Sequence, residues 1–142
     1  MISSEKVTVP GRYSEIERLC QFITEGAIQA NFDDDTLFKI QLACDEACTN
    51  VIEHAYGAED QGEIVVQWQL TATDFIIIIA DQGQPFDPQI VPQPDRALPI
   101  EELKVGGLGL HFMRKLMDNI TFSFTDNGNL LTMVKHRPVP AG

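Results

Sequence analysis

Apolar and polar positions follow helical and strand-like rhythms in turn along the chain. Residues 5–9 alternate like a short strand. Over 13–30 the apolar residues recur at helical spacing, which predicts a first helix. Three aspartates at 33–35 can supply an N-cap and first-turn carboxylates, so a second helix is predicted from there through Tyr56. Gly57 is expected to end it.

Strand-like patterns follow. Residues 63–70 alternate as in a strand with one buried face, whereas 74–81 are continuously apolar, which predicts a central strand covered on both sides. Near the C-terminal end, 120–126 and 129–136 read as two strands. The Asn-Gly pair at 127–128 between them is a strong hairpin signal.

The segment 84–105 breaks these rhythms, since it holds five of the eight prolines and shows no periodicity. Each side of it is short for a separate domain, so it is interpreted as one lid-like loop, poorly ordered without a ligand, inside a single domain of residues 1–142. A third helix is predicted at about 108–118. The resulting fold class is α+β, a two-layer sandwich of a mixed or antiparallel sheet with three helices on one face.

Net charge, the length of apolar runs and the cysteine pattern limit the classes of partner and location that fit the chain. A net charge of −11 over 142 residues argues against nucleic acid or an anionic membrane as partner, because both attract Lys and Arg. The longest apolar run, at 75–80, is far shorter than the roughly 20 residues that cross a bilayer. No signal peptide is visible. Cys20, Cys44 and Cys48 form no CxxC pair and are expected to be buried thiols in the cytoplasm, with a metal site the less favoured alternative.

Candidate chemistry begins on the second helix. Glu46 and Asn50 are four residues apart and therefore share one side of it, away from the apolar side. They could form a solvated polar face. They could also form a carboxylate base beside an amide oxygen, which suits a hard cation such as Mg²⁺. His54 continues this side and is expected to be partly buried or to cap the helix.

The second candidate is Asp81-Gln82-Gly83, which directly follows the predicted central strand. Alone, this is a weak turn signal. An ionised Asp81 at the end of a core strand still needs a donor, which a ligand amino group or a backbone N–H would provide. Gly83 would let the backbone pass close to a flat ring.

The third candidate is the set of glycines before the third helix, at 106, 107 and 109. They match neither the Walker A pattern nor the dinucleotide-binding pattern. Backbone N–H groups at a helix start, with the helix dipole behind them, favour an anion. The glycines could equally be a flexible entry into the helix.

Taken together, these motifs resemble a known family. "DEACTNVIEHAY", "DQGQPFDP" and "GGLGLHFMRKLMD" are similar to the motifs of the GHKL (Bergerat-fold) ATP-binding superfamily, and most similar to the stand-alone bacterial anti-sigma-factor serine/threonine kinases within it. The resemblance covers residues from about 5 to 137.

The resemblance implies a role for each motif. Glu46 would be the general base, Asn50 would hold Mg²⁺ on the ATP phosphates, and Asp81 would accept a hydrogen bond from the adenine amino group with Gly83 beside the ring. The amides that meet the phosphates would be those of Gly107, Leu108, Gly109 and Leu110. Lys104 could add a cation there.

One position departs from the family pattern. Many members place a Thr after a Gly in the last strand, near the adenine. Here Asn129 follows Gly128, and the nearest threonine is Thr132. Which of the two faces the nucleotide is left open.

The implied function is ATP-dependent phosphorylation of a STAS-type anti-sigma-factor antagonist, together with binding of a sigma factor, by a homodimer. Four alternatives remain: an ATP-binding partner-switch module without phosphotransfer, a stand-alone ATPase, a histidine-kinase-like catalytic domain, and an α+β domain with no nucleotide site.

Overall fold

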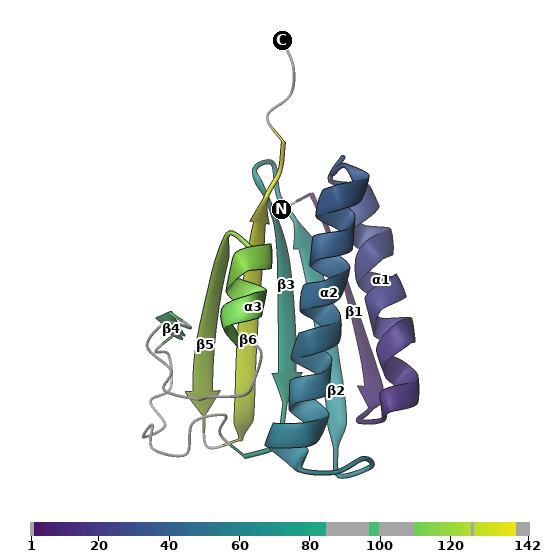
Figure 1. Ribbon diagram of the computed structural model, residues 1–142, viewed down its shortest axis with the longest axis vertical. Helices are drawn as coiled ribbons and strands as arrows, with labels where there is room; N and C mark the ends of the chain where they lie inside the picture. Colours follow the sequence, from purple (N-terminus) through teal and green to yellow (C-terminus); the bar gives the residue numbers. More distant parts are fainter. Residues whose placement is uncertain (1, 85–96, 100–109, 126, 139–142) are drawn as a thin grey trace.

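The computed structural model describes residues 2–84, 97–99, 110–125 and 127–138. Its strands form one sheet in the order β1-β2-β3-β6-β5-β4, and every neighbouring pair is antiparallel (Figure 1). Their bounds are β1 Ser3–Pro10, β2 Glu63–Leu70, β3 Asp74–Asp81, β4 Ala97–Pro99, β5 Asn119–Thr125 and β6 Gly128–His136.

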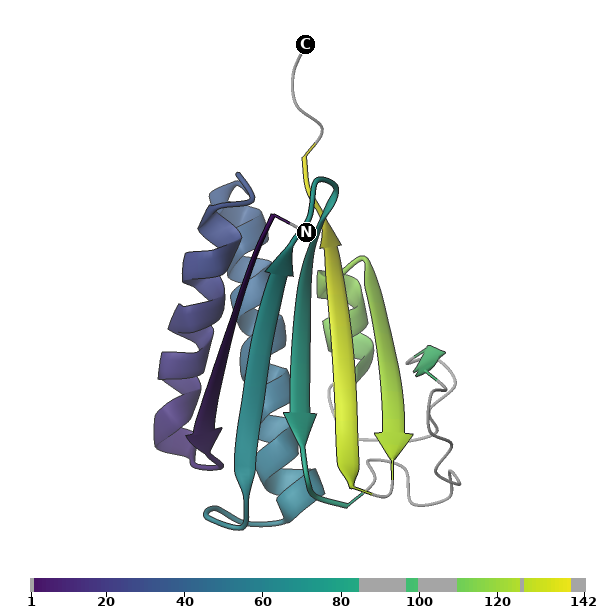
Figure 2. The same cartoon turned by 180° about the vertical axis from the view of Figure 1, so that it is seen from behind.

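The helices all cover one face of this sheet, and the other face is open (Figures 1 and 2). A short 3₁₀ turn, η1, precedes α1, and a π-helical turn, η2, directly continues α2. Their bounds are η1 Tyr13–Glu15, α1 Ile16–Ile28, α2 Asp34–Asn50, η2 Val51–Tyr56 and α3 Leu110–Leu116. The predicted α+β two-layer sandwich is confirmed, and of the two predicted sheet types the antiparallel one is correct. No helix in these ranges is long and apolar enough to span a membrane.

The second predicted helix has the expected ends. Asp33 is its N-cap, and its carboxylate accepts a hydrogen bond from the Thr36 backbone N–H at 2.8 Å. Gly57 ends it in the left-handed conformation, with φ of 81°. The helix runs to Tyr56 as predicted, but its last six residues form the π-helical turn η2 rather than α-helix.

Strand β3 is central, as predicted, but only one of its faces is covered by helices. Phe75, Ile77 and Ile79 are buried beneath them, whereas Ile76 and Ile78 are half-buried on the open face. The expectation of cover on both sides is therefore wrong. A run of isoleucines occurs in strands covered on one face as well as in strands covered on both, since β-branched side chains also favour half-buried strand positions.

The proline-rich segment contains one short strand, β4, which pairs with β5 and was not predicted. The predicted disorder of this segment without a ligand concerns residues 85–96 and 100–105, which lie outside the described residues.

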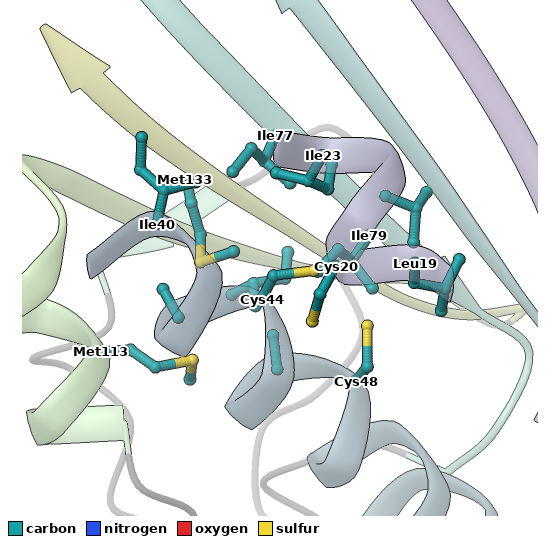
Figure 3. Packing of buried hydrophobic residues seen from close by; sticks show 14 of the residues in the cluster. Leu19, Cys20, Ile23, Ile40, Cys44, Cys48, Ile77, Ile79, Met113 and Met133 are labelled. Carbon is teal, nitrogen blue, oxygen red and sulfur yellow. The ribbon is translucent and has the colours of Figure 1, made fainter. Parts of the chain in front are cut away.

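The core lies between the helices and the sheet (Figure 3). Burying each large aliphatic side chain there contributes about 1.5–3 kcal/mol. Cys20, Cys44 and Cys48 are free and buried within this layer, as predicted. A hydrogen bond with Cys44 and burial both raise the pKa of the Cys20 thiol, so it stays protonated and unreactive. No metal-binding cluster of His, Cys, Asp and Glu exists within the described ranges.

Candidate functional site

Asp81 is the last residue of β3 and points to the same side as the buried Ile77 and Ile79, because strand side chains alternate. Only 6% of Asp81 is exposed. A buried carboxylate is costly unless donors surround it. The donors to Asp81 come from the turn that follows it and from β6.

The backbone N–H groups of residues 82–84 all have acceptors. In order, these are the Tyr56 hydroxyl at 2.9 Å, the Asp81 Oδ1 at 2.8 Å and the Ala55 carbonyl at 2.8 Å. Two of the three acceptors belong to the π-helical turn at the end of α2. The turn after β3 is therefore fixed both by Asp81 itself and by that helix end.

Asn129 is the second donor to Asp81, and it lies directly across from Asp81 in the β3–β6 ladder. Its Nδ2 donates to Asp81 Oδ1 at 2.9 Å and to the Gln84 carbonyl at 2.7 Å. Thr132 is an odd number of residues away on β6, so it lies on the open face of the sheet. Asn129, and not Thr132, is the residue beside Asp81.

The charge of Asp81 is set by two opposing influences. Burial raises the pKa of the carboxyl group, and hydrogen bonds from Asn129 and from the Gly83 backbone N–H act in the opposite direction. Both donors act on Oδ1. This arrangement holds the carboxylate in one orientation, in which it can accept a donor from a ligand.

Two glycines make this packing possible. A Cβ on Gly83 would lie 2.4 Å from the Ala55 carbonyl oxygen, so the glycine allows the turn to contact the helix end. Gly128 has φ of 140°, and a Cβ there would lie 1.9 Å from the Asp81 carbonyl oxygen. A glycine is thus required at position 83 for packing against Ala55, in addition to the role expected for Gly83 beside a flat ring.

The polar side of α2 ends near this turn, and the helix contacts both α1 and α3. Asn50 is its last residue and is only 4% exposed, whereas Glu46, one turn earlier, is partly exposed. A solvated polar face is therefore wrong for Asn50. The Glu46 side chain makes no hydrogen bond or ion pair with another described residue. His54 is exposed, so the expected partial burial is wrong.

The third motif is only partly described. Gly107, Leu108, Gly109 and Lys104 lie outside the described residues. Leu110 is the first residue of α3. The first residue of α3 is at the end of this helix that is directed toward the side of the molecule where β3 ends at Asp81 (Figure 1).

Grooves lined wholly by described residues do not coincide with these polar residues. A groove of about 510 Å³ lies between α1 and α2, and its lining includes Tyr13, Phe38 and Asp45 but neither Asn50 nor Asp81. Its walls lack the buried, hydrogen-bonded carboxylate that Asp81 provides. We therefore place the candidate site at Asp81 from its chemistry.

Sequence reasoning missed Tyr56. Its hydroxyl binds two backbone groups, the Gln82 N–H and the Glu63 carbonyl, which are 26 and 7 residues away. A tyrosine before Gly57 carries no signal of such contacts, because backbone partners leave no residue type to recognise. Only the neighbouring glycines, which make room for its ring, hint at it.

An antiparallel sheet covered on one face by helices, with a buried Asp at the end of its central strand and a Glu/Asn helix beside it, defines the class of histidine-kinase-like ATP-binding domains. Comparison with known proteins agrees. The model of the histidine kinase-like ATPase domain matches residues 9–135, and the chain belongs to this family.

Curated relatives narrow the family further. A serine-protein kinase RsbW of Halalkalibacterium halodurans is 35% identical over 135 residues, which is 92% of this chain and 81% of the relative. A serine-protein kinase RsbW of Bacillus velezensis is 30% identical over 92% of this chain and 82% of the relative. The chain is thus similar to RsbW proteins over most of both lengths.

A solved structure supports the fold. The crystal structure of the RsbU and RsbW domains of Rv1364c from Mycobacterium tuberculosis matches with a TM-score of 0.69 and 18% identity. The match covers 98% of this chain and 34% of that longer chain. At this identity the likeness concerns the fold alone.

Proposed function

We propose that the protein is an ATP- and Mg²⁺-dependent serine/threonine protein kinase that acts as a single domain. Its substrate would be a STAS-type anti-sigma-factor antagonist, and it would regulate a sigma factor by binding it. The similarity to RsbW serine-protein kinases over 92% of the chain carries this proposal. The resemblance in the motifs also supports a homodimer and a cytoplasmic location.

Asp81 recognises the base in this proposal. Its Oδ1 accepts from Gly83 and Asn129, which holds the carboxylate in the orientation in which it accepts the adenine amino group. A carboxylate that is held by fixed donors discriminates well, because a ligand without the matching donor leaves a buried charge without a partner. Gly83 lies beside the ring.

Glu46 and Asn50 serve the phosphate end. Glu46 takes the proton from the Ser or Thr hydroxyl of the substrate. As it does so, the hydroxyl oxygen bonds to the γ-phosphorus of ATP, and the bond between that phosphorus and the leaving ADP oxygen breaks. An amide oxygen at Asn50 fits Mg²⁺, which accepts a few protein oxygens and keeps several waters. When bound, the ion would neutralise phosphate charge. The backbone amides of Gly107, Leu108, Gly109 and Leu110 would contact the phosphates in this proposal.

The test compares two acidic residues that are neighbours on α2. Glu46→Gln should lower phosphate transfer to a STAS-domain protein of the same organism by about 10²–10⁴-fold, since general base catalysis contributes that much. ATP affinity should not change. Asp45→Asn is the matched control, because Asp45 is exposed and, within the described part of the chain, accepts a side-chain hydrogen bond only from Thr49 of its own helix.

Equal transfer by both variants would contradict the role of Glu46. If the wild-type protein binds ATP and transfers nothing, the protein is a binding module. If it releases free phosphate without modifying the STAS protein, it is an ATPase. Absence of ATP binding would refute the proposal as a whole.

A further inference from the structure

Tyr56 links four parts of the fold through one side chain. It is the last residue of η2, the π-helical continuation of α2. Its hydroxyl accepts from the Gln82 N–H at 2.9 Å and donates to the Glu63 carbonyl at 2.6 Å. Both the donor and the acceptor function of the hydroxyl are used, so a shift of the ring breaks both hydrogen bonds.

The ring of Tyr56 is seated between two glycines. A Cβ on Gly62 would lie 2.5 Å from the ring, and one on Gly11 would lie 3.4 Å from it. The Gly11 N–H also donates to the Gly62 carbonyl at 2.8 Å, which ties the end of β1 to the segment before β2. The ring therefore cannot move far, and its hydroxyl is a fixed point.

The residue before it reinforces the link. The Ala55 carbonyl accepts from the Gln84 N–H at 2.8 Å, and Gly83 packs directly against Ala55. Two consecutive residues at the end of the helix thus hold both sides of the turn. The remaining N–H of that turn, on Gly83, binds Asp81 Oδ1 at 2.8 Å.

We propose that Tyr56 is a positioning residue that fixes the Asp81–Gln84 turn relative to the helix bearing Glu46 and Asn50. Through this contact it sets how far the base-recognising carboxylate lies from the phosphate end. This inference rests on the proposed function, since it assigns Asp81 to the adenine. Tyr56 does not touch the nucleotide. It acts through Gln82.

The first test needs no nucleotide. Tyr56→Phe keeps the ring in its seat and removes only the hydroxyl, so amide hydrogen exchange at residues 82–84 should become about five- to tenfold faster, as expected for one lost hydrogen bond. Tyr13→Phe is the control, because Tyr13 is exposed at η1 and its hydroxyl contacts Glu53 of η2, so its loss removes a contact to the same π-helical turn without touching residues 82–84. Unchanged exchange at 82–84 in Tyr56→Phe would overturn the proposal.

The second test uses base discrimination. Inosine triphosphate carries a carbonyl where ATP carries the amino group. Tyr56→Phe should raise KM for ATP and leave kcat unchanged. The preference for ATP over inosine triphosphate should fall by about five- to tenfold, because the substitution removes one hydrogen bond. Ile23→Val, a substitution in the core of α1, controls for general loss of stability.

The outcomes separate cleanly. A lower Tm with unchanged discrimination in Tyr56→Phe would make the residue merely structural and refute its positioning role. Equal loss of discrimination in Ile23→Val would do the same. If wild-type protein fails to bind ATP, the proposed function fails, while the exchange measurement still decides whether Tyr56 fixes the turn.

Discussion

Strands β3 and β6 pair along their whole length, and at each end an aspartate of β3 lies across from a polar residue of β6. At one end the pair is Asp74 and His136, and at the other it is Asp81 and Asn129. The same residue type thus occupies both ends of one ladder. The two aspartates nevertheless differ in burial, in partner and in the direction of their pKa shift.

Asp74 behaves as an ordinary surface carboxylate. His136 Nδ1 lies 2.6 Å from its Oδ1, and the His136 side chain is 67% exposed. The hydrogen bond with His136 lowers the pKa of Asp74, and the same bond raises the pKa of His136. Each group favours the charged form of the other, so this end stabilises the protein when both are ionised.

Asp81 shows the opposite behaviour, because burial raises the pKa of Asp81 and its partners are neutral donors. Its ionised form is a cost to the folded protein. A chain that keeps such a group at the end of a central strand gains nothing in stability from its charge. The comparison therefore supports the proposal that Asp81 binds a ligand, whereas Asp74 stabilises the fold.

The most disruptive change is expected at Gly128. Gly128→Ala would place a Cβ 1.9 Å from the Asp81 carbonyl oxygen at a φ of 140°. Backbone strain of about 1–3 kcal/mol adds to this overlap, so we expect a loss of more than about 2 kcal/mol in the free energy of unfolding, measured with urea. ATP binding should fall as the Asp81 end distorts.

Gly57→Ala is the control for strain alone. Gly57 also has a positive φ, of 81°, but nothing lies within 4 Å of a Cβ there. It should cost about 1–2 kcal/mol, the usual penalty for a left-handed residue, and leave ATP affinity intact. Equal effects of the two alanines would show that the two strands are not tightly packed at Asp81.

The next largest effect separates the two aspartates directly. In Asp81→Asn the donors Gly83 and Asn129 hold the amide oxygen in the Oδ1 position, which turns the amide NH₂ toward the ligand. Two donors then face each other, so ATP should bind about 10–100-fold more weakly, equivalent to about 1–3 kcal/mol. The affinity for inosine triphosphate should fall much less. Titration calorimetry measures both.

Asp74→Asn should show the reverse pattern, with unchanged ATP affinity and a lower free energy of unfolding. Asp81→Asn should not lower that free energy at neutral pH, because it removes a charge that burial disfavours. A loss of stability at position 81 together with normal ATP binding would invalidate the contrast between the two ends.

The fold was largely predictable from the chain because each segment has a clear period. Three details were not, and one of them is the short strand β4 within the proline-rich segment. The π-helical turn has no signal in the local sequence, and its Ala55 carbonyl accepts from Gln84, a contact that depends on tertiary packing. The open face of β3 was missed because half-buried Ile76 and Ile78 look the same in sequence as fully covered residues.

The parts of the site that depend on neighbouring residues in the sequence were predictable. The need of Asp81 for a donor was inferred from its place after an apolar strand, and the Gly83 N–H supplies one. The Asn129 side chain donates to Asp81 from 48 residues away, and the Tyr56 hydroxyl accepts from Gln82, which is 26 residues away; neither separation follows a period or a motif. Glu46 and Asn50 keep their predicted roles as a proposal.

A smaller effect is expected at Asn129. Asn129→Ala removes a hydrogen bond that favours the ionised form of Asp81, so ATP affinity at neutral pH should fall about fivefold. The pKa of Asp81 should also rise further. Because the carboxylate protonates as pH falls through its folded-state pKa, the acid limb of the binding profile should move to higher pH.

Thr132→Ala is the matched control for this change, because Thr132 lies on the open face of the same strand. Its binding profile should match that of the wild-type protein. An unmoved acid limb in Asn129→Ala would mean that Asp81 does not govern the pH dependence of binding.

The smallest effect is expected at the other end of the ladder. The pKa of His136 is raised by Asp74 first and also by Asp118, so the protonated histidine stabilises the folded state. That contribution is complete below the unfolded-state pKa of about 6.5 and is lost as pH rises through the folded-state value. His136→Gln should therefore lower the free energy of unfolding slightly at about pH 5.5 and leave it unchanged at about pH 8.5. Urea titrations at the two pH values measure this, and ATP affinity should be the same as in the wild-type protein at both. A change in ATP affinity would mean that the two ends of the ladder are coupled and that Asp74 is not only structural.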